Sequence, residues 1–134
     1  MTAIVIRRWR MPAAGAPPTR SRFFHAWDRL AYHYDKAAYW VRTGRRSNAS
    51  RHLVELRTLT SALAVENDVA LLIWASRALI AEVDGDLAEA TEATERLVQA
   101  MRIVLKEWPE CPYVTRLDVV NELDALRAMR LRLA

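Results

Sequence analysis

Histidines and carboxylates at helical spacing are the first residues of this sequence that could do chemistry. The histidines are His25, His33 and His52. His25 is followed at steps of three and four residues by Asp28, Tyr32 and Asp35, so the four side chains would share one face of a helix and could contribute metal ligands. The Glu-x-x-His pairs of two-iron bundles are missing, and so are HExxH and CxxC. We therefore interpret this face as the polar surface of an amphipathic helix and expect no metal site.

The sequence offers little support for covalent or phosphate chemistry. Cys111 is the only cysteine and lies in an expected turn between Pro109 and Pro112. A single thiol cannot form an intrachain disulfide, and as a nucleophile it would need a base brought close by the fold. The three glycines are too far apart to form a phosphate-binding loop, and nothing resembles a nucleophile elbow. We expect no enzymatic activity, no catalytic residue and no cofactor.

Arginine is the residue type that the sequence does concentrate. Eighteen of the 20 basic residues are arginines, and residues 1–51 carry a net charge of +9. Residues 52–110 carry −6, and the last 24 residues carry +1. The basic first third could pair with the acidic middle within one fold, pair with it between subunits, or face a separate partner.

Four arginines and two aromatic residues gather around the expected turn between the first two helices. They are Tyr39, Trp40, Arg42, Arg45, Arg46 and Arg51. Arginine, tryptophan and tyrosine are the residues enriched at binding hot spots, and clustered positive charge steers acidic partners toward a surface. We hypothesise that the protein is a non-enzymatic adaptor or regulatory module that binds an acidic protein partner through this third of the chain.

Nucleic-acid binding is the alternative function for the same arginines. Together with those of residues 1–22, they could neutralise several phosphates, while Trp9 and Tyr39 could stack on unpaired bases. Against this hypothesis, no expected helix has a basic face free of acids, and no helix-turn-helix signature is present. Binding that falls steeply with salt would favour the nucleic acid.

Helices must position all of these side chains. Apolar residues recur at steps of three and four residues in the ranges 21–43, 47–66, 67–83, 86–108 and 113–133. The sequence therefore predicts an all-α fold of about five antiparallel amphipathic helices, as an up-down bundle or as stacked helical hairpins. The third range is apolar nearly all round, so we expect it at the centre. The last range is expected to bury Leu117, Val120, Leu123, Leu126 and Met129.

The helix boundaries are predicted from capping residues. Ser47 or Asn48 is expected to cap the second helix, and Asp86 the fourth. Residues 47–83 could form one helix or two, since no Gly or Pro interrupts them. Asn67 and Asp68 are good capping residues, and the apolar stripes on either side differ in phase. We predict a break at this point.

The second glycine turn resembles the tetratricopeptide repeat. Its matching residues are Trp74, Ala78, Gly85, Asp86, Glu89 and Ala90. The first turn matches only at Ala37, Gly44 and Ala49, and the glycines are 41 residues apart, longer than the 34-residue period. The resemblance covers about 30 residues, and such turns occur in unrelated hairpins, so it identifies no family.

The remaining expectations concern organisation and location. Residues 1–20 are expected to be a flexible or extended arm, although their arginine-rich, acid-free composition also suits a targeting segment. Residues 21–134 are expected to form one helical domain. No run approaches the roughly 20 apolar residues of a membrane span, so we expect no membrane contact and a cytoplasmic location. The last helix ends in alternating Arg and Leu, which would suit self-association as a homodimer.

Overall fold

The computed structural model describes residues 21–62, 70–111 and 114–133, with side chains in the first range from residue 29 onward. These residues form α1 (Ser21–Arg42), α2 (Arg46–Ala62), α3 (Ala70–Asp84), α4 (Leu87–Glu107) and α5 (Arg116–Leu133), with no strand in the described ranges. The all-α prediction is confirmed, and residues 47–83 belong to two helices as predicted. The expected arm, the side chain of His25 and the break itself lie outside the described residues.

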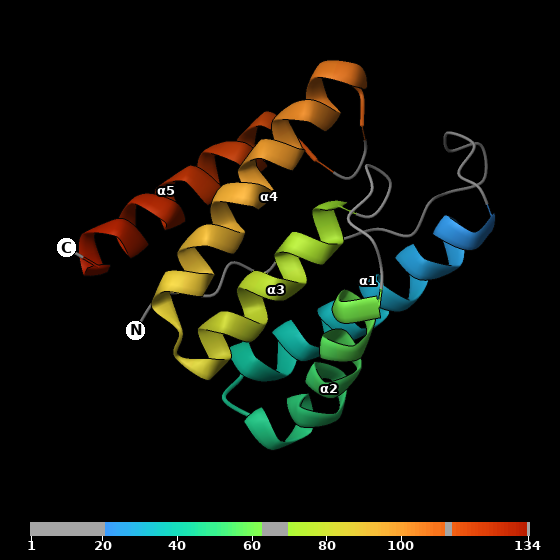
Figure 1. The fold of residues 1–134 in the computed structure, drawn as a ribbon, viewed down its shortest axis with the longest axis vertical. Coiled ribbons are helices and arrows are strands. Elements are labelled where there is room, and N and C mark those ends of the chain that lie inside the picture. Colours follow the sequence, from blue (N-terminus) through green and yellow to red (C-terminus); the bar gives the residue numbers. More distant parts are fainter. Residues whose placement is uncertain (1–20, 63–69, 112–113, 134) are drawn as a thin grey trace.

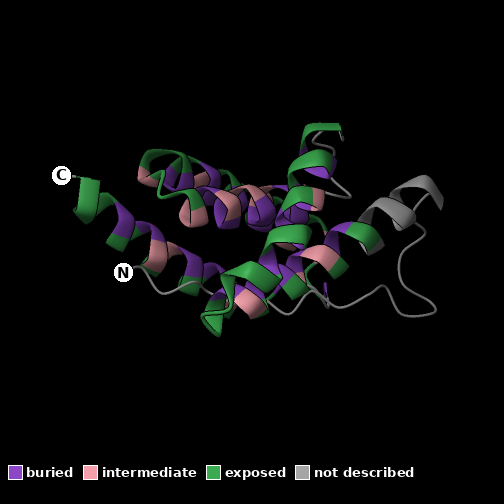
Figure 2. Cartoon of the chain, turned by 90° about the horizontal axis from the view of Figure 1, so that it is seen from below, coloured by how far each residue is buried: buried purple, intermediate pink, exposed green. Residues whose placement is uncertain are grey.

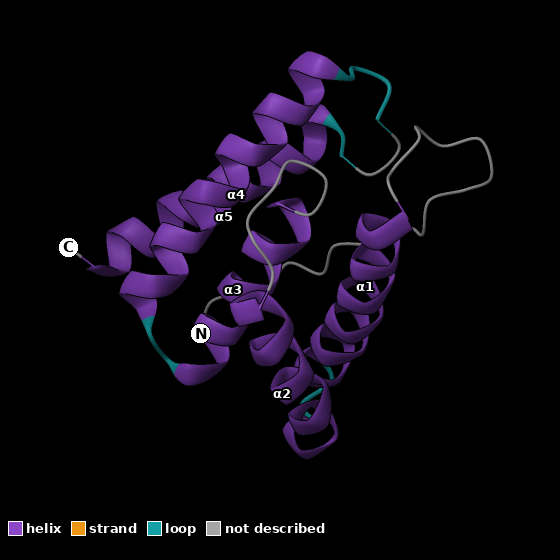
Figure 3. Cartoon of the chain, turned by 45° about the vertical axis from the view of Figure 1, so that its right-hand side comes forward, coloured by secondary structure: helices purple, strands orange, loops and turns teal. Residues whose placement is uncertain are grey.

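The helices pack as two hairpins with α5 added at one side (Figure 1). The α1–α2 hairpin lies against α3, which also pairs with α4, while α5 packs against α4 alone among the helices. Short loops join α1 to α2 and α3 to α4, and a longer connection leads from α4 to α5 (Figure 3). This arrangement corresponds to stacked helical hairpins.

The core follows from the apolar composition of α3. Leu72, Ile73 and Ala75 are fully buried, together with Leu30 and Tyr34 of α1. Buried residues lie between the helices and exposed residues face outward (Figure 2). The predicted central position of the third helix is confirmed, because a helix with apolar residues on most sides needs neighbours on most sides.

Two arginines fasten α2 to α3. Arg57 donates two hydrogen bonds to the carboxylate of Asp84, with N–O distances of 3.0 and 2.6 Å. Arg77 donates to the backbone carbonyl of Thr60 at 2.9 Å, near the end of α2, and its guanidinium lies 4.8 Å from the centre of the Trp74 ring. These bonds join the two hairpins through polar groups as well as through the core.

Both hairpin turns use the same backbone geometry. Gly44 and Gly85 have φ angles of 78° and 76°, in the left-handed region that side chains disfavour. After Gly44, the Arg45 amide donates to the Trp40 carbonyl at 2.8 Å, and after Gly85 the Asp86 amide donates to the Ala81 carbonyl at 2.9 Å. Each glycine amide also bonds the carbonyl three residues before it, which completes a Schellman motif.

The two turns differ in how they start the next helix. The side chain of Asp86 accepts a hydrogen bond from the Glu89 amide at 3.1 Å, as predicted for the cap of α4. The prediction that Ser47 or Asn48 caps α2 is wrong. The helix begins at Arg46, and the Asn48 amide donates to the backbone carbonyl of Arg45 at 3.0 Å. Arg45 therefore occupies the position that Asp86 has in the second turn, but its side chain carries no hydrogen-bond acceptor.

The predicted buried face of the last helix is partly wrong. Leu126 and Met129 are buried as expected, but Leu117 is 66% exposed and Val120 is 50% exposed. Val119 and Glu122 are buried in their place. The buried face of α5 includes a carboxylate, Glu122. An apolar pattern counts Glu122 as a surface residue, so the sequence did not indicate this face.

None of the described helices is long and apolar enough to cross a membrane.

The Asp86 cap provides a direct test of the turn geometry. We expect Asp86→Ala to lower the free energy of unfolding by about 1 kcal/mol, because the Glu89 amide loses its acceptor. The measurement is urea denaturation followed by circular dichroism. Ser50→Ala, an exposed position within α2, is the control and should change stability by less than half as much. Equal effects of the two substitutions would contradict the capping role of Asp86.

Candidate partner-binding site

All six predicted site residues lie on or close to the surface where α1 turns into α2. Arg42 ends α1, Arg45 and Arg46 precede and begin α2, and all three are exposed. Tyr39 is 47% exposed, whereas Trp40 is half-buried and packs against the core. Arg51 is exposed farther along α2. The structure thus gathers five of the six around the turn and places Arg51 beside a second cluster.

Trp40 and Arg45 hold each other in place at the turn. The guanidinium carbon of Arg45 lies 5.8 Å from the centre of the Trp40 ring, and the Arg45 amide bonds the Trp40 carbonyl. The Tyr39 ring meets the Trp40 ring edge-on, with centroids 5.0 Å apart. A guanidinium over an aromatic face keeps its charge available while losing part of its side-chain freedom. The Trp40 ring therefore supports the Arg45 guanidinium, and Tyr39 is the more accessible of the two aromatic rings.

Of the arginines at the turn, Arg45 and Arg46 occupy positions that do not favour stability. Arg42 lies in the last turn of α1, where the helix dipole favours a cation. Arg45 and Arg46 lie at the start of α2, where the dipole disfavours a cation, and the first turn of α2 contains no acid. Within the described residues, none of Arg42, Arg45, Arg46 and Arg51 forms an ion pair or a side-chain hydrogen bond. Three other arginines differ in this respect, because Arg57, Arg77 and Arg130 each bond an acceptor on another helix.

A histidine pair that the sequence reasoning missed lies farther along the same hairpin. The Nδ1 atoms of His33 in α1 and His52 in α2 are 3.0 Å apart, a hydrogen bond in which one ring donates and the other accepts. The Tyr32 ring stands edge-on to both, with centroid distances of 5.1 and 5.7 Å. His52 is buried and His33 is half-buried. The described residues include no group of three or more potential ligands that could hold a metal ion.

Burial lowers the pKa of both histidines below the ordinary value of 6.5. For His33, Glu55 opposes this effect, while Arg29 and Arg51 lower the pKa further. For His52, His33, Arg51 and Lys36 add to the lowering. Both rings are therefore neutral at pH 7, and the charge around them comes from Arg29, Lys36 and Arg51, with Glu55 as the opposing acid.

A symmetry of the hairpin could have revealed the histidine pair. Trp40 and Arg45 are equally distant from the midpoint of the turn, and so are His33 and His52. His33 also lies seven residues before Trp40, and His52 seven residues after Arg45, so each pair shares a helix face. The two contacts therefore lie on one edge of the hairpin, about 10 Å apart along it.

This surface is called the α1–α2 edge below. It comprises Arg29, His33, Lys36, Trp40, Arg45, Arg51, His52 and Glu55. Four cations and one carboxylate give it a positive field, and Arg42, Arg46 and Tyr39 extend it around the turn. The arrangement suits binding of acidic groups, with an aromatic contact at one end.

Family models, curated proteins and solved structures were compared with this chain, and none of them matches it.

The histidine pair predicts a pH dependence of stability. Unfolded histidines have a pKa near 6.5, so between 6.5 and the lowered folded pKa values the unfolded chain binds more protons than the folded one. The free energy of unfolding should be highest above pH 6.5 and should fall as the pH decreases from 6.5 through the lowered pKa values of the folded state. Urea midpoints between pH 7.5 and pH 5 measure the effect.

In the double variant His33→Gln/His52→Gln, the urea midpoint should depend less on pH, whatever the stability of this variant at pH 7.5. Hydrogen bonding to Arg57 lowers the pKa of Asp84 below its ordinary 3.8, so that pair acts in a more acidic range and does not confuse the measurement. An unchanged slope in the double variant would show that other groups carry the pH dependence.

Proposed function

We propose that this protein is a non-enzymatic helical interaction module, of the adaptor or regulatory kind, that binds an acidic segment of a protein partner along the α1–α2 edge. One observation supports this proposal above the others. Arg45 and Arg46 are at the start of α2 without an acid in its first turn, while the matching turn before α4 carries Asp86 and Glu89. Arginines that stability does not favour are best explained by contacts outside the chain.

The contacts suggest how binding would proceed. Exposed arginines attract an acidic segment over long range, and this raises the association rate more than the final affinity. The Arg45 guanidinium is already held over Trp40, so it loses less freedom when it meets a carboxylate. Tyr39, 47% exposed beside them, supplies apolar contact area.

Nucleic-acid binding is the second candidate, and Tyr39 is the observation that favours it. An exposed ring beside Arg42 and Arg46 could stack on an unpaired base while the arginines bind phosphates. Glu55 and the buried side of Trp40 support the protein partner instead, because nucleic acid prefers surfaces without acids and with free aromatic faces.

Two further parts of the proposal concern the state of the protein. The exposed Leu117 and Leu131 on α5 support self-association as a homodimer. The single buried thiol of Cys111 fits the reducing cytoplasm. Sedimentation at several concentrations tests the first of these, and Leu131→Glu should then yield a monomer.

Charge reversal at the turn tests the proposed site. The probes are a fluorescent peptide rich in Glu, Asp and Leu, and a random single-stranded DNA of the same charge. We expect Arg45→Glu/Arg46→Glu to weaken peptide binding at least tenfold, because two attractions become repulsions. Fluorescence anisotropy at several salt concentrations is the measurement.

The matched control for this experiment is Arg96→Glu/Arg127→Glu, which makes the same change in net charge at exposed positions of α4 and α5. It should weaken peptide binding less than threefold. Equal loss in both variants would mean that net charge alone attracts the peptide. Tighter and more salt-sensitive binding of the DNA than of the peptide would favour the nucleic-acid alternative.

Arg45→Asp separates stability from binding. The new carboxylate would occupy the position of Asp86 and could accept a hydrogen bond at the start of α2, so we expect the free energy of unfolding to rise by about 0.5–1 kcal/mol. Peptide affinity should fall in the same variant. Loss of stability with unchanged affinity would contradict the functional assignment of Arg45.

A further inference from the structure

A groove on the other side of the molecule combines an apolar floor with positive charge. It lies between the end of α4 and the start of α5 and has a volume of about 490 Å³. The apolar lining residues are Leu105, Pro109, Val119 and Val120, and the charged ones are Arg102, Lys106 and Arg116. Neither α1 nor α2 packs against α4 or α5, so this groove is separate from the α1–α2 edge.

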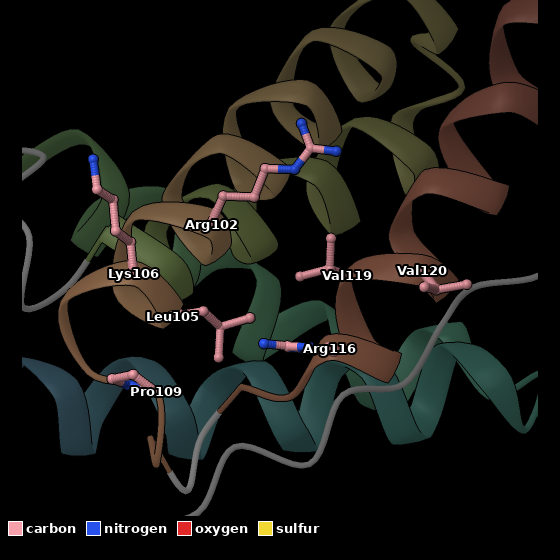
Figure 4. A pocket seen from close by; sticks show the side chains of 7 residues that line it. All are labelled: Arg102, Leu105, Lys106, Pro109, Arg116, Val119 and Val120. Atoms are coloured by element: carbon pink, nitrogen blue, oxygen red, sulfur yellow. The ribbon is translucent and has the colours of Figure 1, made fainter.

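The side chains are arranged with apolar groups between cations. In Figure 4, Val119 of α5 lies between the Arg102 guanidinium and Arg116, and Leu105 of α4 lies beside Arg116. Val119 is 9% exposed and Val120 is 50% exposed, so the groove runs from a buried floor to an open rim. The Lys106 ammonium points away from the other lining side chains (Figure 4).

The capping of α5 engages the carboxylate of Asp118, which lies in the same helical turn as Arg116 and Val119. The Thr115 amide donates to Asp118 at 2.8 Å, and the Asp118 amide donates to the Thr115 hydroxyl at 3.2 Å, which is a reciprocal capping box. This pair fixes the first turn of α5 and with it the positions of Arg116 and Val119. Among the described residues that line the groove none is acidic, so no carboxylate in this lining balances the three cations.

We propose that this groove binds a small amphipathic anion, with a carboxylate on an unbranched hydrocarbon chain as the ligand class. The carboxylate would bind a guanidinium group at the rim, that of Arg102 or that of Arg116, because a guanidinium can hold a carboxylate through paired hydrogen bonds. The chain would cover Leu105, Val119 and Val120. The groove volume falls within the range of about 300–1,000 Å³ that small-molecule sites occupy.

Charge and lining argue against other occupants. None of the described residues that line the groove is aromatic, so an unpaired base would find no stacking partner among them. A second copy of the same groove is disfavoured too, because symmetric pairing would place cations against cations. An apolar chain with one negative end matches both the floor and the rim.

Calorimetric titration of the intact protein with decanoate, below its micelle concentration, tests the proposal. Decanol is the neutral comparison with a chain of the same length. We expect saturable one-to-one binding of decanoate and at least tenfold weaker binding of decanol. Arg102→Gln/Arg116→Gln should weaken decanoate binding at least tenfold, and Val120→Asn, at an exposed position, at least threefold.

The controls separate this site from general charge and from the proposed partner site. Arg96→Gln/Arg127→Gln removes the same charge outside the groove and should leave decanoate affinity within twofold, and Arg45→Glu/Arg46→Glu should do likewise. Absence of saturable binding, equal affinity for decanoate and decanol, or equal loss in the two glutamine double variants would overturn the proposal. Circular dichroism of each variant confirms that it is folded.

Discussion

Burial of α3 on several sides is the constraint on which the rest of the fold depends. Its apolar residues require neighbours in more than one direction, and α1, α2 and α4 supply them. The two hairpins must therefore stack against each other through α3, and α5 is left to pack on α4 alone. This stacking leaves the α1–α2 turn and the α4–α5 groove as separate surfaces.

The two hairpin turns share one backbone conformation but differ in what their side chains do. Both use a glycine at positive φ followed by the same pair of backbone hydrogen bonds. In the second turn, Asp86 adds a capping bond and so contributes to stability. In the first turn, the Arg45 side chain cannot accept a capping bond, and its guanidinium lies over the Trp40 ring. The two turns thus differ in side-chain chemistry and not in backbone conformation, and this difference is the reason for proposing the first turn as a binding surface.

The sequence was sufficient for features that depend on neighbouring residues. Five helices and a central α3 follow from apolar spacing, and the turn arginines are close enough in sequence to be recognised together. The sequence was insufficient for features that depend on how the helices pack against one another. The face of α5 was misjudged because Glu122 is buried there while Leu117 is not. His33 and His52 meet only after α1 and α2 pack antiparallel, and the groove needs Arg102 and Arg116 from two helices.

Amide chemical-shift mapping is the most direct test of the central claim that acidic groups bind where α1 turns into α2. An acidic peptide would be titrated into isotopically labelled protein at low salt. The account predicts that the largest shifts fall between residues 39 and 52 and saturate together. Shifts centred on α4 and α5, or small shifts spread evenly over every arginine-bearing surface, would contradict it.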